Sequence, residues 1–148
     1  MPMPRLLFPR LMCVCAGLVD APALAEQQVL LPDPSGQVGF VTPSGNAGCR
    51  FTPAGGTEVY RPADGGPELV CERVEPEYFT IILGAEGPAT LIADPGEMGC
   101  CGATNTLAYG NYAILEPFIC FSAREGLNCE TLDDRHGLFL SRTVVETH

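Results

Sequence analysis

The chain has 148 residues, and 18 acidic against 8 basic side chains give it a formal net charge of −10 at pH 7. All the basic residues are arginine. So acidic a surface repels phosphate backbones and anionic lipid headgroups, which disfavours nucleic acid and anionic membranes as partners. The composition is typical of a soluble exported protein, and a cationic partner or a metal is the sharper alternative.

Residues 1–25 follow the plan of a secretory signal peptide. Arg5 and Arg10 supply a positive start, 11–19 form a short apolar core, and Ala23-Leu24-Ala25 is a small-x-small cleavage site. The apolar core is far shorter than the roughly 20 residues that a membrane-spanning helix needs. We therefore expect a cleaved leader, a secreted or periplasmic protein, and no membrane span.

After the leader, the sequence predicts a flexible lead-in over residues 26–36 and a single disulfide-rich β domain over residues 37–148. The lead-in is rich in proline and lacks any hydrophobic period. Short strand-like runs separated by Gly, Pro, Asn and Asp then follow at 37–42, 47–52, 57–61, 68–74, 78–83, 89–93, 104–109, 112–115, 118–122, 127–131 and 137–146. No window keeps a helical period, so we expect an all-β fold: a small antiparallel barrel or sandwich stapled by disulfides.

The predicted cleavage site separates the cysteines into a group within the leader and a group in the exported chain. Two of the eight, Cys13 and Cys15, fall inside the leader. The remaining six would be exported, and an even set in a small exported domain is typical of a disulfide framework in an oxidising compartment: Cys49, Cys71, Cys100, Cys101, Cys120 and Cys129.

Two pairings follow from spacing. If Arg124-Glu125 form a two-residue hairpin turn, Cys120 lies directly opposite Cys129, within reach of a bridge. Cys49 and Cys71 lie on strand-like runs on either side of a Gly/Pro-rich excursion. Their bridge would close a loop worth roughly 3 kcal/mol on the chain-entropy model.

The adjacent pair Cys100-Cys101 remains open. A vicinal disulfide is strained, because adjacent Cα atoms are only about 3.8 Å apart, and such a bridge could be redox-active. Alternatively, the two side chains point to opposite faces of a strand, where each bridges another cysteine or one stays buried and free. The chain contains no Cys-x-x-Cys, which disfavours both a zinc site and thioredoxin-like chemistry.

His136 is the candidate general base. A functional interpretation makes it a base or ligand oriented by Asp134, with Ser44 or Ser141 as a nucleophile. Neither serine has a Gly-x-Ser-x-Gly context. The sequence therefore favours a turn histidine that hydrogen-bonds the backbone, and it assigns no catalytic residue, cofactor or metal ligand.

Several short stretches together carry a resemblance to a known family: residues 40–49, 69–72, 107–110, 120–122, 126–129 and 136–142. They resemble, in the same order, a family of small exported bacterial proteins known only as a domain of unknown function. The resemblance implies a disulfide-stabilised β-rich domain behind a signal peptide, with Cys49–Cys71 and Cys120–Cys129 as natural pairs and no assigned catalytic residue. Where many members place a cysteine before an Asp-Trp-Gly-like stretch, this chain has Tyr78-Phe79-Thr80 and no tryptophan.

These observations predict a non-enzymatic binding or envelope-interaction module. Its partner would be a protein or an envelope component, and a cationic one suits the charge of the chain. Two alternatives stay open: a proteinaceous inhibitor of a basic hydrolase, and a small hydrolase that uses His136.

Overall fold

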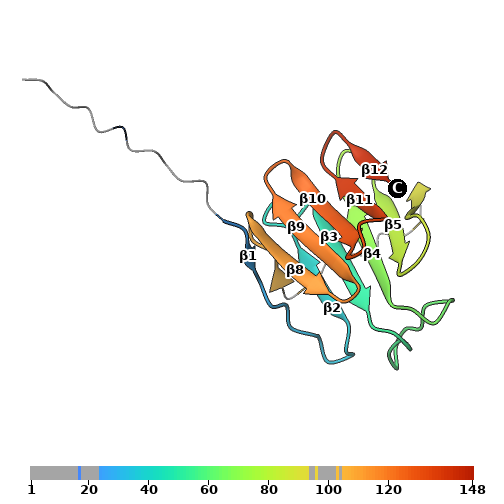
Figure 1. Ribbon diagram of the computed structural model, residues 1–148. Coiled ribbons are helices and arrows are strands. Elements are labelled where there is room, and N and C mark those ends of the chain that lie inside the picture. The colour runs from blue at the N-terminus through green and yellow to red at the C-terminus, as the bar shows by residue number, and fades with distance from the viewer. Residues whose placement is uncertain (1–16, 18–23, 94–95, 97–102, 104) are drawn as a thin grey trace, which may run out of the picture.

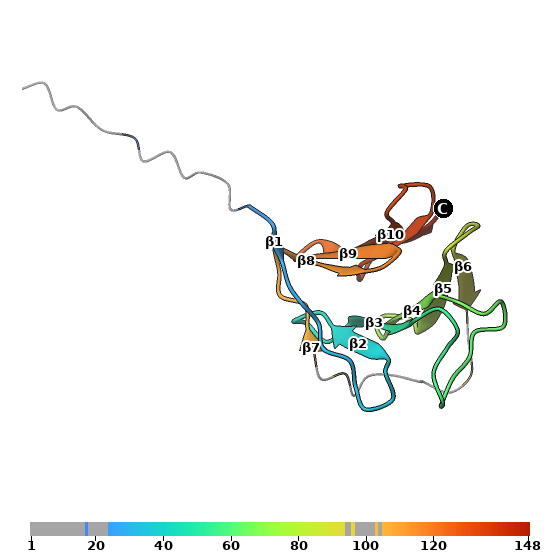
Figure 2. The same ribbon diagram turned by 60° about the horizontal axis from the view of Figure 1, so that its bottom comes forward.

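Two six-stranded sheets pack face to face in the computed structural model, which describes residues 17, 24–93, 96, 103 and 105–148. Sheet A has the order β1 (Glu26–Gln27), β8 (Asn111–Leu115), β9 (Phe118–Ala123), β10 (Gly126–Thr131), β11 (Gly137–Leu140) and β12 (Val145–Thr147). Sheet B has the order β6 (Thr90–Ala93), β5 (Phe79–Gly84), β4 (Glu68–Arg73), β3 (Ala47–Thr52), β2 (Val38–Val41) and β7 (Asn105–Thr106). Figure 1 shows sheet A in front of sheet B, and Figure 2 shows the two layers from the side.

The predicted all-β class is confirmed, and of the two architectures the sandwich is the correct one. The sheets are separate hydrogen-bonded units that do not close into a barrel. Most neighbouring strands are antiparallel, but β1 pairs with β8 and β2 pairs with β7 in parallel. These two parallel pairs involve strands of only two residues, β1 and β7, at one edge of each sheet.

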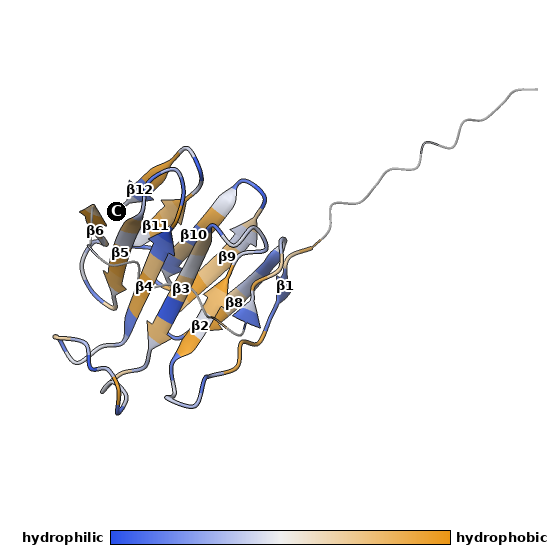
Figure 3. Ribbon diagram, turned by 180° about the vertical axis from the view of Figure 1, so that it is seen from behind, coloured by the Kyte–Doolittle hydropathy of each residue, from blue (hydrophilic) through white to orange (hydrophobic). Residues whose placement is uncertain are grey.

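The core lies between the sheets and follows a period of two along each strand. On β9, for example, Phe118, Cys120 and Ser122 are buried, while the residues between them are half-buried on the opposite face. Phe118 of sheet A meets Phe51 of sheet B edge to face, with ring centroids 6.1 Å apart. Alternation of this kind is the expected pattern for a sheet with one face against a core. Figure 3 shows hydrophobic stretches along the strands and a strongly hydrophilic block within β3.

The run 57–61 was predicted as a strand and is a loop instead. Gly55 and Gly56, with φ of 84° and 76°, turn the chain out of the extended region just before it. Thr57 N then donates to Tyr60 O across 2.7 Å, and Tyr60 Oη donates to Glu68 Oε1 across 2.7 Å. The Thr57–Tyr60 bond uses backbone groups that strand pairing would need. The Tyr60–Glu68 bond attaches the loop to β4.

The run 137–146 was predicted as one strand and forms two. Ser141 Oγ accepts hydrogen bonds from Val144 N at 2.9 Å and from Thr143 N at 3.3 Å, and Ser141 N donates to Val144 O at 2.8 Å. A serine hydroxyl that bonds the following backbone favours a turn over a strand. The chain therefore reverses at Ser141, and β12 folds back on β11.

Residues 26–36, predicted as a flexible lead-in, are attached to the domain. Glu26 and Gln27 pair with β8, and Leu30 is a buried member of the core at 8% exposure. Asn105 also joins this segment to sheet B, since its side chain bonds Leu31 N, Leu31 O and Gly39 O. Proline content alone therefore does not make this segment independent of the domain.

The lowered pKa values of two aspartates in turns, Asp33 and Asp133, predict that the fold is less stable in acid. Hydrogen bonding from Ser35 lowers the pKa of Asp33 below its ordinary value, and hydrogen bonding from Thr131 does the same to the pKa of Asp133. A carboxylate whose pKa is lower in the folded state stabilises the fold above its unfolded pKa of 3.8. That stabilisation is lost as the pH falls through the folded value.

The variant Asp33→Asn/Asp133→Asn should therefore lose less stability on acidification than the wild type. Denaturant unfolding at neutral pH and at a pH below 3.8 measures this difference. Glu86→Gln, in an exposed turn, is the matched control. Equal acid sensitivity of the wild type and the double variant would contradict the assignment.

Candidate functional site

The two predicted disulfides are confirmed, and each joins neighbouring strands. Cys49 and Cys71 are register partners on β3 and β4, with an S–S distance of 2.10 Å. Cys120 and Cys129 are register partners on β9 and β10, with an S–S distance of 2.18 Å. Arg124-Glu125 form the predicted two-residue turn, because Ala123 pairs with Gly126. Such bonds are consistent with an oxidising, extracellular environment.

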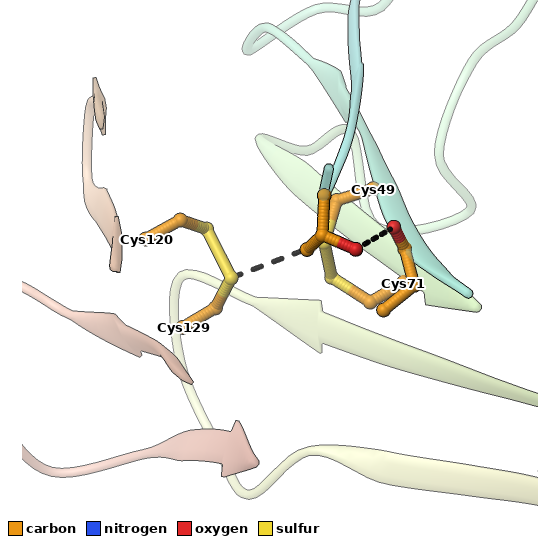
Figure 4. The surroundings of a disulfide bond; sticks show 6 residues. Cys49, Cys71, Cys120 and Cys129 are labelled. Atoms are coloured by element: carbon orange, nitrogen blue, oxygen red, sulfur yellow. Dashed lines mark hydrogen bonds between the residues drawn. A yellow bond between two sulfur atoms is a disulfide. The ribbon is translucent and has the colours of Figure 1, made fainter. Parts of the chain in front are cut away.

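The two disulfides also meet each other in the core, a contact that spacing did not predict. Cys49 Sγ lies 3.9 Å from Cys129 Sγ, so one bridge from each sheet contacts the other across the sandwich (Figure 4). The sulfurs of Cys49, Cys120 and Cys129 lie within 4.8 Å of one another. Metals bind thiolates, and these sulfurs are oxidised, so the cluster is structural in this state. Cys100 and Cys101 lie outside the described residues.

His136 occupies a turn and bonds through its backbone. Its N–H donates to Thr131 Oγ1 at 3.2 Å, and its carbonyl accepts from Thr131 N at 2.8 Å. Its Nδ1 is buried without a hydrogen-bond partner in the described part of the chain. There, no hydrogen bond joins the imidazole to Asp134, the group predicted to orient it.

The two candidate nucleophiles lie far from His136. Ser141 follows β11 and His136 precedes it, so five residue steps along the strand separate them by roughly 16 Å at about 3.3 Å per residue. Ser44 and Ser141 line one pocket at the opposite end of the sandwich from His136. The described residues therefore do not assemble a serine–histidine pair.

The outer face of sheet A carries several large apolar side chains. Tyr112, Phe121, Asn128, Phe139 and Glu146 are successive register partners across β8 to β12, so they share one face. The burial pattern places this face outside, because the alternate residues of the same strands are the buried ones. A second outer row contains Ile114, Ile119 and Glu130. We call the apolar members of both rows the aromatic face: Tyr112, Ile114, Ile119, Phe121 and Phe139.

Phe139 packs closely within this face. A Cβ built on Gly126 would come within 2.5 Å of Phe139 Cζ and 2.6 Å of Leu140 O, so the Phe139 ring lies directly over the glycine. Tyr112, Ile119, Phe121 and Phe139 are half-buried, and Ile114 is 39% exposed. The face therefore presents partly exposed apolar surface to its surroundings, which is a common property of binding sites.

The charges on the outer face of sheet A are acidic. Glu130 lies beside Ile119 in the second row, and Glu146 lies beside Phe139 in the first. Asp133 and Asp134 are in the following β10–β11 turn, where the exposed Arg135 makes a 3.8 Å ion pair with Asp133. The apolar surface is thus bordered by negative charge.

A concave region lies on the outer face of sheet B. It encloses about 550 Å³ and is lined by apolar strand residues such as Val41, Val70 and Ile82, together with Arg50 and Glu72. Ala103 also borders it, and the residues on either side of Ala103 lie outside the described part of the chain.

The aromatic face escaped the sequence analysis, although the sequence contains a signal for it. Residues 112–115 and 118–121 are almost continuously apolar, whereas a strand with one solvated face should alternate. In a two-layer β-sandwich, only one face of each sheet packs against the core. A strand that is apolar on both faces therefore indicates that its outer face is covered by another element or is an exposed binding surface.

No helix in the described part of the chain is long or apolar enough to cross a bilayer. Comparison of the chain with protein-family models, curated proteins and solved structures gave no match. The candidate site therefore rests on the residues themselves.

Proposed function

We propose that this chain is an exported, non-enzymatic binding module that docks a basic protein on its aromatic face. The observation that supports this most is the outward row of Tyr112, Phe121 and Phe139, an apolar surface on a sheet whose other side already forms the core. Aromatic side chains contribute most to interface free energy when they are rigid and become fully desolvated on binding.

Charge selects the class of partner. Glu130 and Glu146 lie within the rows of the aromatic face, and the chain has a formal net charge of −10. A basic surface would meet complementary charge there, which raises the association rate and disfavours acidic competitors. A second copy of the chain would bring like charges together, so self-association on this face is the less favoured arrangement.

A secreted hydrolase of high isoelectric point is the second candidate partner, and this chain would then be its inhibitor. The acidic border of the aromatic face favours this role, because a basic enzyme would meet complementary charge there. The alternative of a small hydrolase gains less support, since His136 lies at the other end of β11 from Ser141. Membership of the exported domain family and a secreted or periplasmic location are parts of the same proposal.

The test is calorimetric titration of the full chain against a panel of basic secreted hydrolases, a lysozyme and a pancreatic-type ribonuclease among them. We expect binding that weakens as ionic strength rises. Phe121→Ser should weaken it about tenfold or more, because it removes about 1.4 kcal/mol or more at the centre of the interface. Glu130→Gln/Glu146→Gln should weaken it as well and reduce its dependence on ionic strength, because these carboxylates supply the bordering negative charge. Inhibition assays on the same panel separate inhibition from binding alone.

Ile82→Ser is the matched control. Ile82 is a half-buried apolar residue on the outer face of the other sheet, so its loss should leave binding unchanged. Equal weakening by Phe121→Ser and Ile82→Ser would contradict the assignment to the aromatic face. Failure of every basic protein in the panel to bind, or concentration-dependent dimerisation that Phe121→Ser abolishes, would contradict a basic partner.

A further inference from the structure

Three arginines of this acidic chain line one pocket at the end of the sandwich that carries the β9–β10 and β11–β12 turns. Six arginines lie in the described residues, and Arg73, Arg124 and Arg142 line this pocket. They come from both sheets, since Arg73 ends β4, Arg124 is in the β9–β10 turn and Arg142 is in the β11–β12 turn. One carboxylate, that of Glu125, is among the lining residues. We call this site the arginine pocket.

Arg73 is the fixed member of the site. The residue is 4% exposed, and its guanidinium lies 4.6 Å over the Phe79 ring. Nε donates to Glu77 O at 3.2 Å, and Nη1 donates to Ser141 O at 3.0 Å. Within the described residues no carboxylate forms an ion pair with it. A buried guanidinium held only by neutral groups retains an uncompensated charge, which a bound anion would neutralise.

Arg124 and Arg142 form the rim. The Arg124 guanidinium lies 5.1 Å over the Tyr109 ring, which limits where it can point. Arg142 Nη2 lies 3.3 Å from Glu75 Oε2, but the two side chains are 70% and 63% exposed. Exposed pairs of this kind contribute little free energy, so Arg142 can exchange its partner for an incoming anion at small cost.

The size of the pocket limits what it can hold. Its volume is about 220 Å³. At about 30 Å³ for each water, that is the space of roughly seven waters, which is below the range of about 300–1,000 Å³ that drug-sized ligands occupy. A single oxyanion group with a few waters suits it. Guanidinium groups bind such groups with paired, charge-assisted hydrogen bonds.

We propose that the arginine pocket binds a small oxyanion group, a phosphate or a carboxylate, with Arg73 as the buried contact and Arg124 and Arg142 closing over it. The site lies between the two sheets at their turn end, whereas the aromatic face lies on the outside of sheet A. It is therefore a second binding site, independent of the proposed protein partner. A negative result for oxyanion binding would therefore leave the proposed protein partner untouched, and a negative result for the partner would leave the oxyanion site untouched.

The probes are inorganic phosphate and succinate, titrated separately into the full chain at constant ionic strength set by chloride. We expect saturable shifts of the arginine side-chain NMR signals with at least one probe, and the stronger probe identifies the oxyanion class. Arg124→Gln and Arg142→Gln should each weaken binding roughly 5- to 10-fold, since each removes a charged hydrogen-bonding partner. Arg73→Lys keeps the charge but loses the planar fork, so it should weaken binding at least as much.

Arg135→Gln is the matched control, because Arg135 is an exposed arginine in the turn at the opposite end of β11. It should leave binding unchanged. Shifts that do not saturate with either probe would overturn the proposal, and so would equal weakening by Arg135→Gln and Arg124→Gln. The rim variants change exposed side chains, so the test does not depend on whether Arg73→Lys folds.

Discussion

Replacing Cys49 and Cys71 together by alanine is expected to lower the free energy of unfolding by about 3.4 kcal/mol. The bridge joins residues 22 positions apart, and the chain-entropy model gives that value for a loop of this size. The Cys120–Cys129 bridge spans 9 positions, so its removal should lower the free energy of unfolding by about 2.7 kcal/mol. Denaturant unfolding followed by circular dichroism measures both, since the chain has no tryptophan.

Removal of both bridges should leave the domain largely unfolded. The two losses sum to about 6 kcal/mol, which is comparable to the whole stability of a typical small domain. Because Cys49 Sγ and Cys129 Sγ are in contact, the two losses should also couple instead of adding independently. Unfolding free energies unchanged by either double substitution would show that the corresponding bridge contributes nothing to stability.

Phe118→Ala is expected to lower the free energy of unfolding by about 3–5 kcal/mol. Phe118 is fully buried between the sheets and meets Phe51 edge to face, so its removal leaves a cavity that strand backbones cannot close. Phe121, three residues further along β9, is half-buried on the outer face.

Phe121→Ala is the control for Phe118→Ala, and its effect should be smaller, about 1 kcal/mol, because Phe121 already contacts solvent. Equal losses for the two variants would contradict the assignment of inner and outer faces on β9. A small loss for Phe121→Ala also means that variants of the aromatic face stay folded, so that their binding defects can be interpreted.

The strand framework could be predicted from residues because turn chemistry and alternation are local signals. Ala47–Thr52 was predicted with its observed bounds, and the hairpin around Arg124-Glu125 was predicted with its register. Two predicted strands were wrong because a local feature overrides β propensity. A hydrogen-bonded turn at Ser141 divides the run 137–146, and the positive φ of Gly55 and Gly56 turns the chain before the run 57–61. Nothing local in the sequence indicates that residues 26–27 would pair with residues 111–112.

The two proposed binding surfaces could not be assembled from the sequence, because each joins residues that are distant in the chain. The aromatic face depends on the register of β8 to β11, which is fixed only when the strands assemble. The arginine pocket brings Arg73 together with Arg142 from the other sheet. The continuous apolar runs 112–115 and 118–121 are the one local signal, and they do not show which residues share a face. The contact between the two disulfides has the same origin.

Amide hydrogen exchange of the full chain, with and without a basic secreted hydrolase at low ionic strength, tests the proposed binding face most directly. The predicted result is slower exchange along β9, β10 and β11 in the complex, with sheet B unchanged and the protection lost in Phe121→Ser. Protection confined to sheet B, or no protection with any basic protein of the panel, would contradict the proposal that the aromatic face binds a basic partner.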